Sequence, residues 1–187
     1  TATVSALTNQ INEHGLYMDR NSVETNEDFL QIIPYMVVKR DLPEKENEVF
    51  IYTRLKQGNE ARLHAHFSAG IGGHVDWVSD SLTCIETLNF NVTKELNEEL
   101  EINTSTGLNI DFCGVLIYDN SNEVGRVHLG CLIEVNTNDH NVGIKEVEKI
   151  EGGFVTLTHL KQMSEDPLKV RCFENWTFLA LKQQRLI

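Results

Sequence analysis

The sequence predicts an α/β or α+β sandwich, in which helices cover a mixed β-sheet. Strand-like segments lie in both halves of the chain, one strongly amphipathic helix lies between them, and helical segments gather near the C-terminus. This order of elements is typical of layered domains built around one hydrophobic core. With 187 residues the chain is long enough to bury such a core.

The first 28 residues are polar and only weakly periodic, so we expect an irregular or partly helical N-terminal extension. Residues 29–187 are predicted to form a single domain. The start of the chain lacks the basic cluster and apolar core of a signal peptide, and the apolar runs are far shorter than a membrane span. We therefore expect a cytoplasmic protein that does not act on a membrane.

A β-hairpin is expected at the start of the domain. Segment 29–40 predicts a strand, in which Pro34 favours the strand start, a bulge or a sheet edge. The charged segment 41–48 contains Pro43 and predicts a turn. In segment 49–56 the side chains alternate between two faces, which predicts the second strand.

An amphipathic helix gives the strongest local signal. Polar loops at 57–62 and 76–83 flank a short segment, 63–75, that contains three glycines. Beyond them, apolar side chains recur at steps of three, four, four and four residues, the spacing of a helix with one apolar face. These side chains are Ile85, Leu88, Val92, Leu96 and Leu100.

The C-terminal half predicts two more strands and two more helices. The strands are rich in β-branched and aromatic residues, and Pro167 precedes the last helix. The expected elements are a strand at 112–118, a turn at 119–125, a strand at 127–135, a loop at 136–153 that ends in a short β-rich pair, a helix at 157–163 and a final helix at 168–184.

Composition argues against several classes of partner. The formal net charge is −12, whereas binding to nucleic acid or to an anionic membrane needs a basic surface. An acidic chain is compatible with an enzyme that gathers divalent cations, although acidity also serves solubility alone. The four cysteines are scattered without a C-x-x-C pair, so they predict neither a zinc site nor a disulfide framework and indicate a reducing compartment.

Three carboxylates on the predicted helix suggest metal chemistry. Glu95, Glu98 and Glu99 follow the spacing i, i+3, i+4, which places them on one face. Like charges so placed repel each other by roughly 0.2–0.5 kcal/mol per pair. A hard cation such as Mg²⁺ turns this repulsion into a favourable interaction, because it binds to a few carboxylates together with phosphate oxygens. On spacing alone, a solvated helix face is the more common explanation.

The surrounding residues resemble the Nudix box, Gly-x5-Glu-x7-Arg-Glu-U-x-Glu-Glu-x-Gly-U, in which U is aliphatic. Seven residues separate Glu86 from Lys94, as the box requires, and the residues after Lys94 keep its register. The stretch 72–76, Gly-Gly-His-Val-Asp, is similar to the way the family enters the box. The matched residues after Lys94 are Glu95, Leu96, Glu98, Glu99 and Ile102.

Three departures from the box affect one loop and two helix positions. Twelve residues separate Gly73 from Glu86 where the family has five, which is an insertion of seven. Lys94 stands where the family has Arg, so the positive charge remains but the bidentate fork is lost. Glu101 stands where the family has Gly. The insertion leaves the helix register intact and is expected to reshape the entrance of the site.

The resemblance implies a Nudix-like α/β/α sandwich with a mixed sheet, and it implies roles for particular residues. Glu95 and Glu99 would be the main Mg²⁺ ligands, with Mn²⁺ as an alternative ion, and Glu98 would be a further ligand or the base that activates water. Glu95 and Lys94 would complete the catalytic group. Gly73 would let the backbone pass close to metal and phosphate. The candidate substrate-side residues are Gly72, Gly73, His74, Arg54 and Glu86.

Other side chains are weaker candidates for the same site. The histidines around the glycines could bind phosphate or a transition metal, Arg54 and Arg62 could bind phosphate, and Trp77 and Tyr118 could stack on a base. Surface charge and core packing are the competing explanations. The histidines are His64, His66 and His74, and the acidic residues where some family members supply an extra carboxylate are Glu146, Glu148 and Glu151. Trp176 is expected in the core.

Three functions stay open at this point. The first is hydrolysis of a diphosphate linkage in a nucleoside diphosphate derivative or a nucleoside triphosphate. The second is a nucleotide-binding regulatory Nudix domain without turnover, which Lys94 and Glu101 motivate and the retained carboxylates oppose. The third, isomerisation of isoprenoid diphosphates, ranks last because no cysteine accompanies a histidine-rich metal site. The expected partner is a small phosphorylated molecule, not nucleic acid, and a homodimer is possible.

Overall fold

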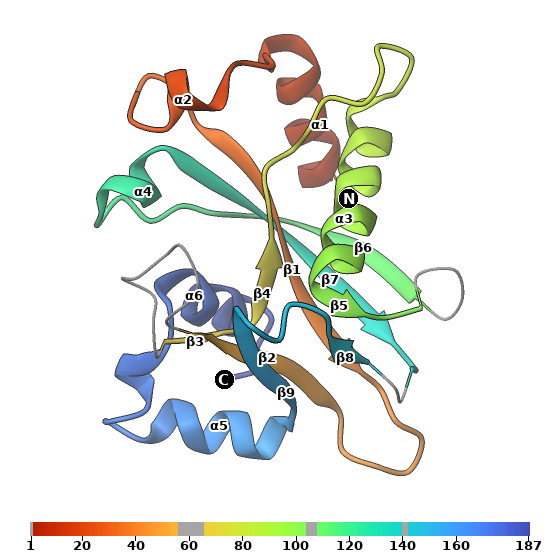
Figure 1. Cartoon of the computed structure of the whole chain (residues 1–187), viewed down its shortest axis with the longest axis vertical. Helices are drawn as coiled ribbons and strands as arrows, with labels where there is room; N and C mark the ends of the chain where they lie inside the picture. The colour runs from red at the N-terminus through yellow and green to blue at the C-terminus, as the bar shows by residue number, and fades with distance from the viewer. Residues whose placement is uncertain (1, 56–65, 104–107, 140–141) are drawn as a thin grey trace.

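A mixed β-sheet runs through the centre of the protein, as the computed structural model shows for residues 2–55, 66–103, 108–139 and 142–187 (Figure 1). The strands follow the order β3-β2-β1-β7-β6, with β4 paired to β1 and β9 paired to β2. They are β1 (Gln31–Arg40), β2 (Glu48–Arg54), β3 (Phe67–Ser68), β4 (Gly70–Gly72), β6 (Leu108–Ile117), β7 (His128–Thr137) and β9 (Ile150–Thr156). Two short strands, β5 (Leu100–Glu101) and β8 (Gly143–Ile144), pair separately.

The two central strands carry the core on both of their faces. β1 pairs with β7 in parallel over its whole length, and both strands are rich in continuous apolar sequence, as expected for strands covered on two sides. Tyr35 and Val37 of β1 face one hydrophobic cluster, whereas Met36 and Val38 face the other. This alternation follows from the two-residue period of a strand.

Helices cover the two faces of the sheet and complete three layers (Figure 1). On one face, α3 (Cys84–Glu99) inserts Val92 and Leu96 into the core. On the other, α5 (Leu157–Glu165) and α6 (Asn175–Gln183) insert Leu160, Met163, Ala180 and Leu181. The predicted mixed α/β/α sandwich is therefore confirmed, and so are the hairpin of β1 with β2 and the amphipathic helix.

The N-terminal segment is helical, and it packs on the domain. It contains α1 (Ala2–His14) and α2 (Arg20–Val23), and α1 contacts β6 and α3. Val23 is buried, and Arg126 donates a hydrogen bond to Glu27 over 2.6 Å. The division into an extension over 1–28 and a domain over 29–187 stays a prediction. No helix in the described ranges is both long and apolar enough to cross a bilayer.

The predicted loop at 136–153 was wrong, because this region contains β8 and part of β9. β9 pairs with β2 in antiparallel register from Glu48↔Thr156 to Arg54↔Ile150. A Cβ atom at Gly152 would lie 2.2 Å from the carbonyl oxygen of Ile51, so the two backbones approach closely there. Gly152 makes this close approach possible. Two adjacent glycines, however, remove the alternation of side chains by which a strand is predicted from the sequence.

The final helix begins later than the predicted residue 168. A 3₁₀ turn at Val170–Cys172 precedes it, and α6 starts at Asn175. Between them Phe173 is extended and forms a parallel bridge with Phe67. Tertiary pairing with β3 therefore interrupts a segment whose composition alone allows a helix. A short helix, α4 (Glu123–Arg126), lies in the region predicted as a turn.

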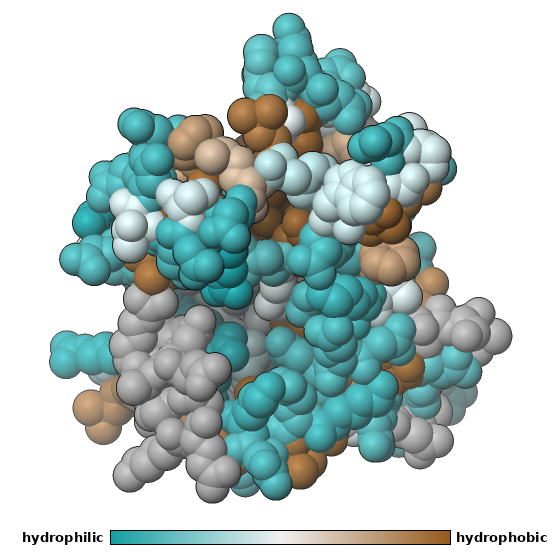
Figure 2. All heavy atoms as spheres, turned by 45° about the horizontal axis from the view of Figure 1, so that its top comes forward, coloured by the Kyte–Doolittle hydropathy of each residue, from teal (hydrophilic) through white to brown (hydrophobic). Residues whose placement is uncertain are grey.

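Several large apolar side chains remain on the surface near α3. Brown atoms gather towards the top of the space-filling view in Figure 2. Exposed apolar residues of the segment between α1 and α2, of the inserted loop and of α3 are Leu16, Tyr17, Met18, Trp77 and Phe90. Trp77 is 57% exposed, and its ring nitrogen donates to Asp80 over 3.3 Å, so it is not a core residue. A homodimer stays a prediction.

The start of α3 depends on a capping box between Thr83 and Glu86. Thr83 Oγ1 accepts from the Glu86 amide over 3.3 Å, and Glu86 Oε2 accepts from the Thr83 amide over 2.8 Å. We expect Thr83→Ala to lower the free energy of unfolding by about 1 kcal/mol, because an unpaired helix amide then lacks its acceptor. Thr83→Ser, which keeps the hydroxyl, should unfold like the parent in urea. Equal stability of the parent and Thr83→Ala would contradict this role.

Candidate active site

The carboxylates of Glu95, Glu98 and Glu99 lie in the last two turns of α3. The capping box fixes the start of this helix, and the buried Leu96 and Leu100 anchor its end in the core. Glu98 is exposed, whereas only 12% of the Glu95 side chain is exposed. The register that buries the leucines therefore turns Glu95 inward and leaves Glu98 at the solvent edge.

Gly73 brings the backbone against the carboxylate of Glu95. The chain leaves the sheet at Gly72, which pairs with Tyr35 of β1, and passes over α3 at the next residue. A Cβ atom at Gly73 would lie 2.3 Å from Cδ of Glu95 and 2.4 Å from both carboxylate oxygens. A side chain at this position would displace the carboxylate, so glycine gives the close approach its room.

Glu99 carries a buried oxygen that lacks a hydrogen-bond partner in the described parts of the chain. This oxygen is Oε2. The pKa of Glu99 is raised to about 7, chiefly by burial; the Arg54 guanidinium opposes this rise, and the carboxylates of Glu146 and Glu95 add to it. A buried carboxylate needs a proton or a cation to offset the loss of water. The buried oxygen of Glu99 is therefore a candidate ligand for a cation.

Lys94 links the carboxylates around the helix end. Its Nζ lies 2.7 Å from Asp76, 3.5 Å from Glu95 and 3.9 Å from Glu98. The hydrogen bond to Asp76 is the main cause of the raised pKa of Lys94. Burial raises the pKa of Glu95, and Lys94 lowers it in turn. Lysine therefore contacts the neighbouring carboxylate that the arginine of the Nudix box would orient.

The donor atoms of the α3 group suit a hard divalent cation. All of them are carboxylate oxygens, which Mg²⁺ and Mn²⁺ prefer. Across the described residues, these carboxylates do not converge to within 4.8 Å as a set, whereas those of Glu24, His74 and His128 do. The buried oxygen of Glu99 and the space over Glu95 at Gly73 nevertheless fit a cation in this place.

A cavity of about 510 Å³ opens beside the glycines. Gly72, Gly73 and His74 form part of its wall, and three arginines from distant segments also line it. The arginines are Arg20, Arg54 and Arg171. Glu24, Asp119 and Glu174 line it too, and Arg20 and Arg54 pair with Glu24 and Glu174, so the wall carries guanidinium groups and carboxylates together. Guanidinium groups are suited to bidentate binding of phosphate oxygens.

One end of the cavity is aromatic. Trp176 packs edge-on against Tyr35, with ring centroids 5.5 Å apart, and both line the cavity together with Phe173. A hydrogen bond holds the Tyr35 ring in place, because its hydroxyl lies 2.8 Å from Oγ1 of the buried Thr177. Trp176 packs against the core cluster but is only partly buried and lines the cavity, so the prediction of a core tryptophan is confirmed only in part.

The structure brings most of the predicted residues together, but not all. Gly72, Gly73, His74 and Arg54 border the cavity, and Lys94 lies with the three carboxylates at the end of α3. Glu86 lies at the opposite end of the helix, exposed and engaged with Thr83. Of the weaker candidates, His66 lines the cavity and Glu146 approaches Glu99, whereas Tyr118, Glu148 and Glu151 are exposed. His64 and Arg62 lie outside the described residues.

Two residues of the cavity wall had no signal in the sequence. Glu24 follows α2, and His128 begins β7, so neither is near the Nudix-like motif along the chain. His128 Nε2 lies 3.2 Å from His74 Nε2. The pKa of His74 is lowered, first by burial and then by Arg20 and His128, so the neutral ring is favoured. Folding alone joins these side chains.

Comparisons with known proteins agree with this geometry. No family model matches the sequence. Protein YmaB of Bacillus subtilis (strain 168) is 40% identical over 146 residues, which are 78% of this chain and 68% of that protein. The crystal structure of Tm1382, a candidate Nudix hydrolase, has a TM-score of 0.74 and 28% identity, covering 98% of this chain and 86% of that one.

Two more distant structures share the fold alone. The Nudix domain of Shewanella oneidensis NrtR, complexed with ADP ribose, has a TM-score of 0.54 and 14% identity, covering 91% of this chain and all of that one. A C. elegans Ap4A hydrolase has a TM-score of 0.51 and 14% identity, covering 75% and 91%. Together with the box residues on α3, these findings show that the chain belongs to the Nudix hydrolase family. Within it, YmaB is a relative at the level of sequence.

The raised pKa of Glu99 predicts a pH-dependent stability in EDTA. The folded protein keeps a proton on Glu99 up to about pH 7, whereas the unfolded chain releases it near the ordinary glutamate pKa of 4.5. The stabilising contribution is therefore complete below pH 4.5 and is lost as the pH rises to about 7, at a cost of roughly 3 kcal/mol. In Glu99→Gln the free energy of unfolding should not fall over this pH range, so this variant should be more stable than the parent at pH 8.

The matched control is Glu98→Gln, because Glu98 is exposed and belongs to the same turn. Urea unfolding between pH 4.5 and 8 gives the free energy of unfolding of the parent and of both variants. In Glu98→Gln this free energy should fall with rising pH as it does in the parent. A parent and a Glu99→Gln variant with the same pH dependence would show that Glu99 does not carry the buried charge.

Proposed function

We propose that this protein hydrolyses a diphosphate linkage in a nucleoside diphosphate derivative or a nucleoside triphosphate, using Mg²⁺ held by Glu95, Glu98 and Glu99. Mn²⁺ is the alternative ion. The observation that carries the proposal is the buried oxygen of Glu99, which lacks a hydrogen-bond partner among the described residues, together with Gly73, which lies against the Glu95 carboxylate and also lines the cavity that contains three arginines. A buried carboxylate suits a cation, and the arginines of the neighbouring cavity suit the phosphates of a polyphosphate.

The α3 carboxylates would hold the cation, and Glu146 is near enough to Glu99 to assist. When bound, Mg²⁺ neutralises phosphate charge, lowers the pKa of water and aligns the attack. Glu99 and Glu95 are the anchored ligands, because their side chains are largely buried. Glu86 supports the arrangement from a distance by fixing the start of α3.

Glu98 is the best placed base. It is the exposed carboxylate of the three, so it can accept a proton from water and return it to solvent. Lys94 lies between Glu95 and Glu98 and limits their repulsion. The chain's own contribution is thus an exposed carboxylate on the same helix end as the proposed cation ligands.

The cavity accounts for the proposed class of substrate. Arg20, Arg54 and Arg171 would bind phosphate oxygens, and Arg54 is oriented by Glu174, whose Oε1 lies 3.6 Å from its Nε. Trp176 at the far end offers a ring face or edge for a base. ADP ribose, the ligand of the Shewanella NrtR domain, is a nucleoside diphosphate derivative of this class.

The test is a screen of nucleoside triphosphates, dinucleoside polyphosphates and nucleotide sugars with Mg²⁺, scoring released phosphate or monophosphate. Activity should vanish in EDTA and return with Mg²⁺. Glu98→Gln should lower kcat by a factor of about 10²–10⁴ while substrate affinity is retained, because a base acts in the transition state. Glu99→Gln should weaken Mg²⁺ binding and turnover together.

Glu148→Gln is the matched control, because Glu148 is exposed on the loop before β9 and should behave as the parent. Activity that survives exhaustive chelation, or full turnover in Glu99→Gln, would refute the proposal. Tight nucleotide binding without hydrolysis of any substrate would assign the chain to the regulatory Nudix domains instead.

A further inference from the structure

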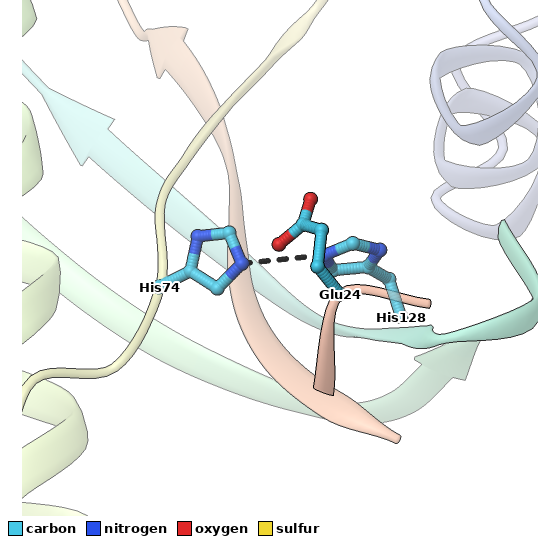
Figure 3. A group of neighbouring side chains, drawn as sticks. All are labelled: Glu24, His74 and His128. Atoms are coloured by element: carbon cyan, nitrogen blue, oxygen red, sulfur yellow. Dashed lines mark hydrogen bonds between the residues drawn. The ribbon is translucent and has the colours of Figure 1, made fainter. Parts of the chain in front are cut away.

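We propose that Glu24, His74 and His128 form a second cation site, separate from the α3 carboxylates, which binds a borderline transition cation of the Zn²⁺ type. One ligand atom from each residue lies within 4.8 Å of the others. Figure 3 shows the two imidazole rings joined by a hydrogen bond between their nitrogen atoms, with the Glu24 carboxylate above them. The inference does not depend on the proposed hydrolysis.

The separation of the two rings fits a tetrahedral ion. His74 Nε2 and His128 Nε2 lie 3.2 Å apart, with the rings at 73° to each other. Two nitrogens bound to one tetrahedral zinc at 2.0–2.1 Å are about 3.3 Å apart. The two nitrogen atoms therefore already have the spacing of zinc ligands, and each ring would turn so that its lone pair points at the ion instead of at the other ring.

The hydrogen bonds of His128 present a lone pair at the right atom. Its Nδ1 lies 2.8 Å from the carbonyl oxygen of Val124, which can only accept, so Nδ1 carries the hydrogen. Nε2 of the neutral ring then has its lone pair directed at His74. A ligand histidine is commonly held in this way, with its second nitrogen donating to a carbonyl.

His74 must change tautomer when the ion binds. Without metal, its Nε2 donates a hydrogen to the lone pair of His128 Nε2. With metal, Nε2 needs its own lone pair, so the hydrogen moves through solvent to Nδ1, and the neutral ring keeps one hydrogen throughout. The ion thus replaces a single shared hydrogen between the two rings.

Glu24 supplies the oxygen ligand from the N-terminal segment. Arg20 Nε donates to Oε2 of Glu24 over 3.0 Å, which leaves the other carboxylate oxygen for the cation. Because the three ligands follow α2, follow β4 and begin β7, an ion would tie the N-terminal segment to the sheet. All three residues line the 510 Å³ cavity, so a water or a substrate oxygen can take the fourth position.

The two proposed cation sites differ in the type of their donor atoms. Two imidazoles and one carboxylate favour Zn²⁺ and related ions, whereas three carboxylates favour Mg²⁺. A Zn²⁺ titration in excess Mg²⁺ therefore favours this site over the α3 carboxylates, and the variants below assign the bound zinc to it. The experiment uses the full chain without a histidine tag, after metal removal, and measures heat and bound zinc.

One equivalent of Zn²⁺ should bind to the parent. Because loss of an outer-shell partner already weakens metal sites by about 10–100-fold, His74→Gln and Glu24→Gln should weaken binding by about tenfold or more. Two matched controls should bind like the parent: Glu99→Gln, at the other cation site, and His159→Gln, an exposed histidine of α5. Equal zinc binding in the parent and in His74→Gln would overturn the proposal.

A second measurement needs no variant. Nitrogen NMR of the imidazoles should find hydrogen on Nε2 of His74 and on Nδ1 of His128 before zinc is added. One equivalent should move the His74 hydrogen to Nδ1 and leave His128 unchanged. If zinc binds and the His74 tautomer does not change, or if no zinc binds at one equivalent, the site does not exist.

Discussion

The constraint on which the site depends is the burial of the Glu99 carboxylate at the end of α3. Leu96 and Leu100 fix the depth and rotation of this helix end, and Glu99 lies between them in sequence, so it cannot turn fully to solvent. Its buried oxygen has no hydrogen-bond partner among the described residues, and burial raises the pKa to about 7. Uncompensated buried charge destabilises a fold. We propose that a cation supplies the compensation, which would explain why a carboxylate occupies a position that packing alone would give to an apolar side chain.

The neighbouring backbone responds to the same constraint. β4 pairs with β1 up to Gly72, and the next residue crosses Glu95 so closely that only glycine leaves room for the carboxylate. Gly72 and Gly73 also line the cavity, so the same short backbone segment borders both the Glu95 carboxylate and the cavity. Arg54 of the cavity wall is close enough to Glu99 to oppose the rise in its pKa. We propose that this segment joins the cation site to the substrate site.

The sequence predicted those parts whose signal is local. The apolar period from Ile85 to Leu100 located α3, and the positions of Glu95, Glu98 and Glu99 followed from it. β9 was missed because adjacent glycines hide a strand that exists through pairing with β2, about a hundred residues earlier. The start of α6 was misplaced because Phe173 pairs with Phe67 instead of continuing a helix. Glu24 and His128 join His74 from opposite sides of the motif, and no spacing along the chain records their meeting.

The central claim is that a cation replaces the proton on Glu99. Calorimetry of Mg²⁺ binding in two buffers with different ionisation enthalpies tests it, because the difference in heat counts the protons released. Since the folded pKa of Glu99 is about 7, the account predicts release of about one proton per Mg²⁺ at pH 6 and far less at pH 8.5. Mg²⁺ binding at pH 6 with no release of protons would contradict it.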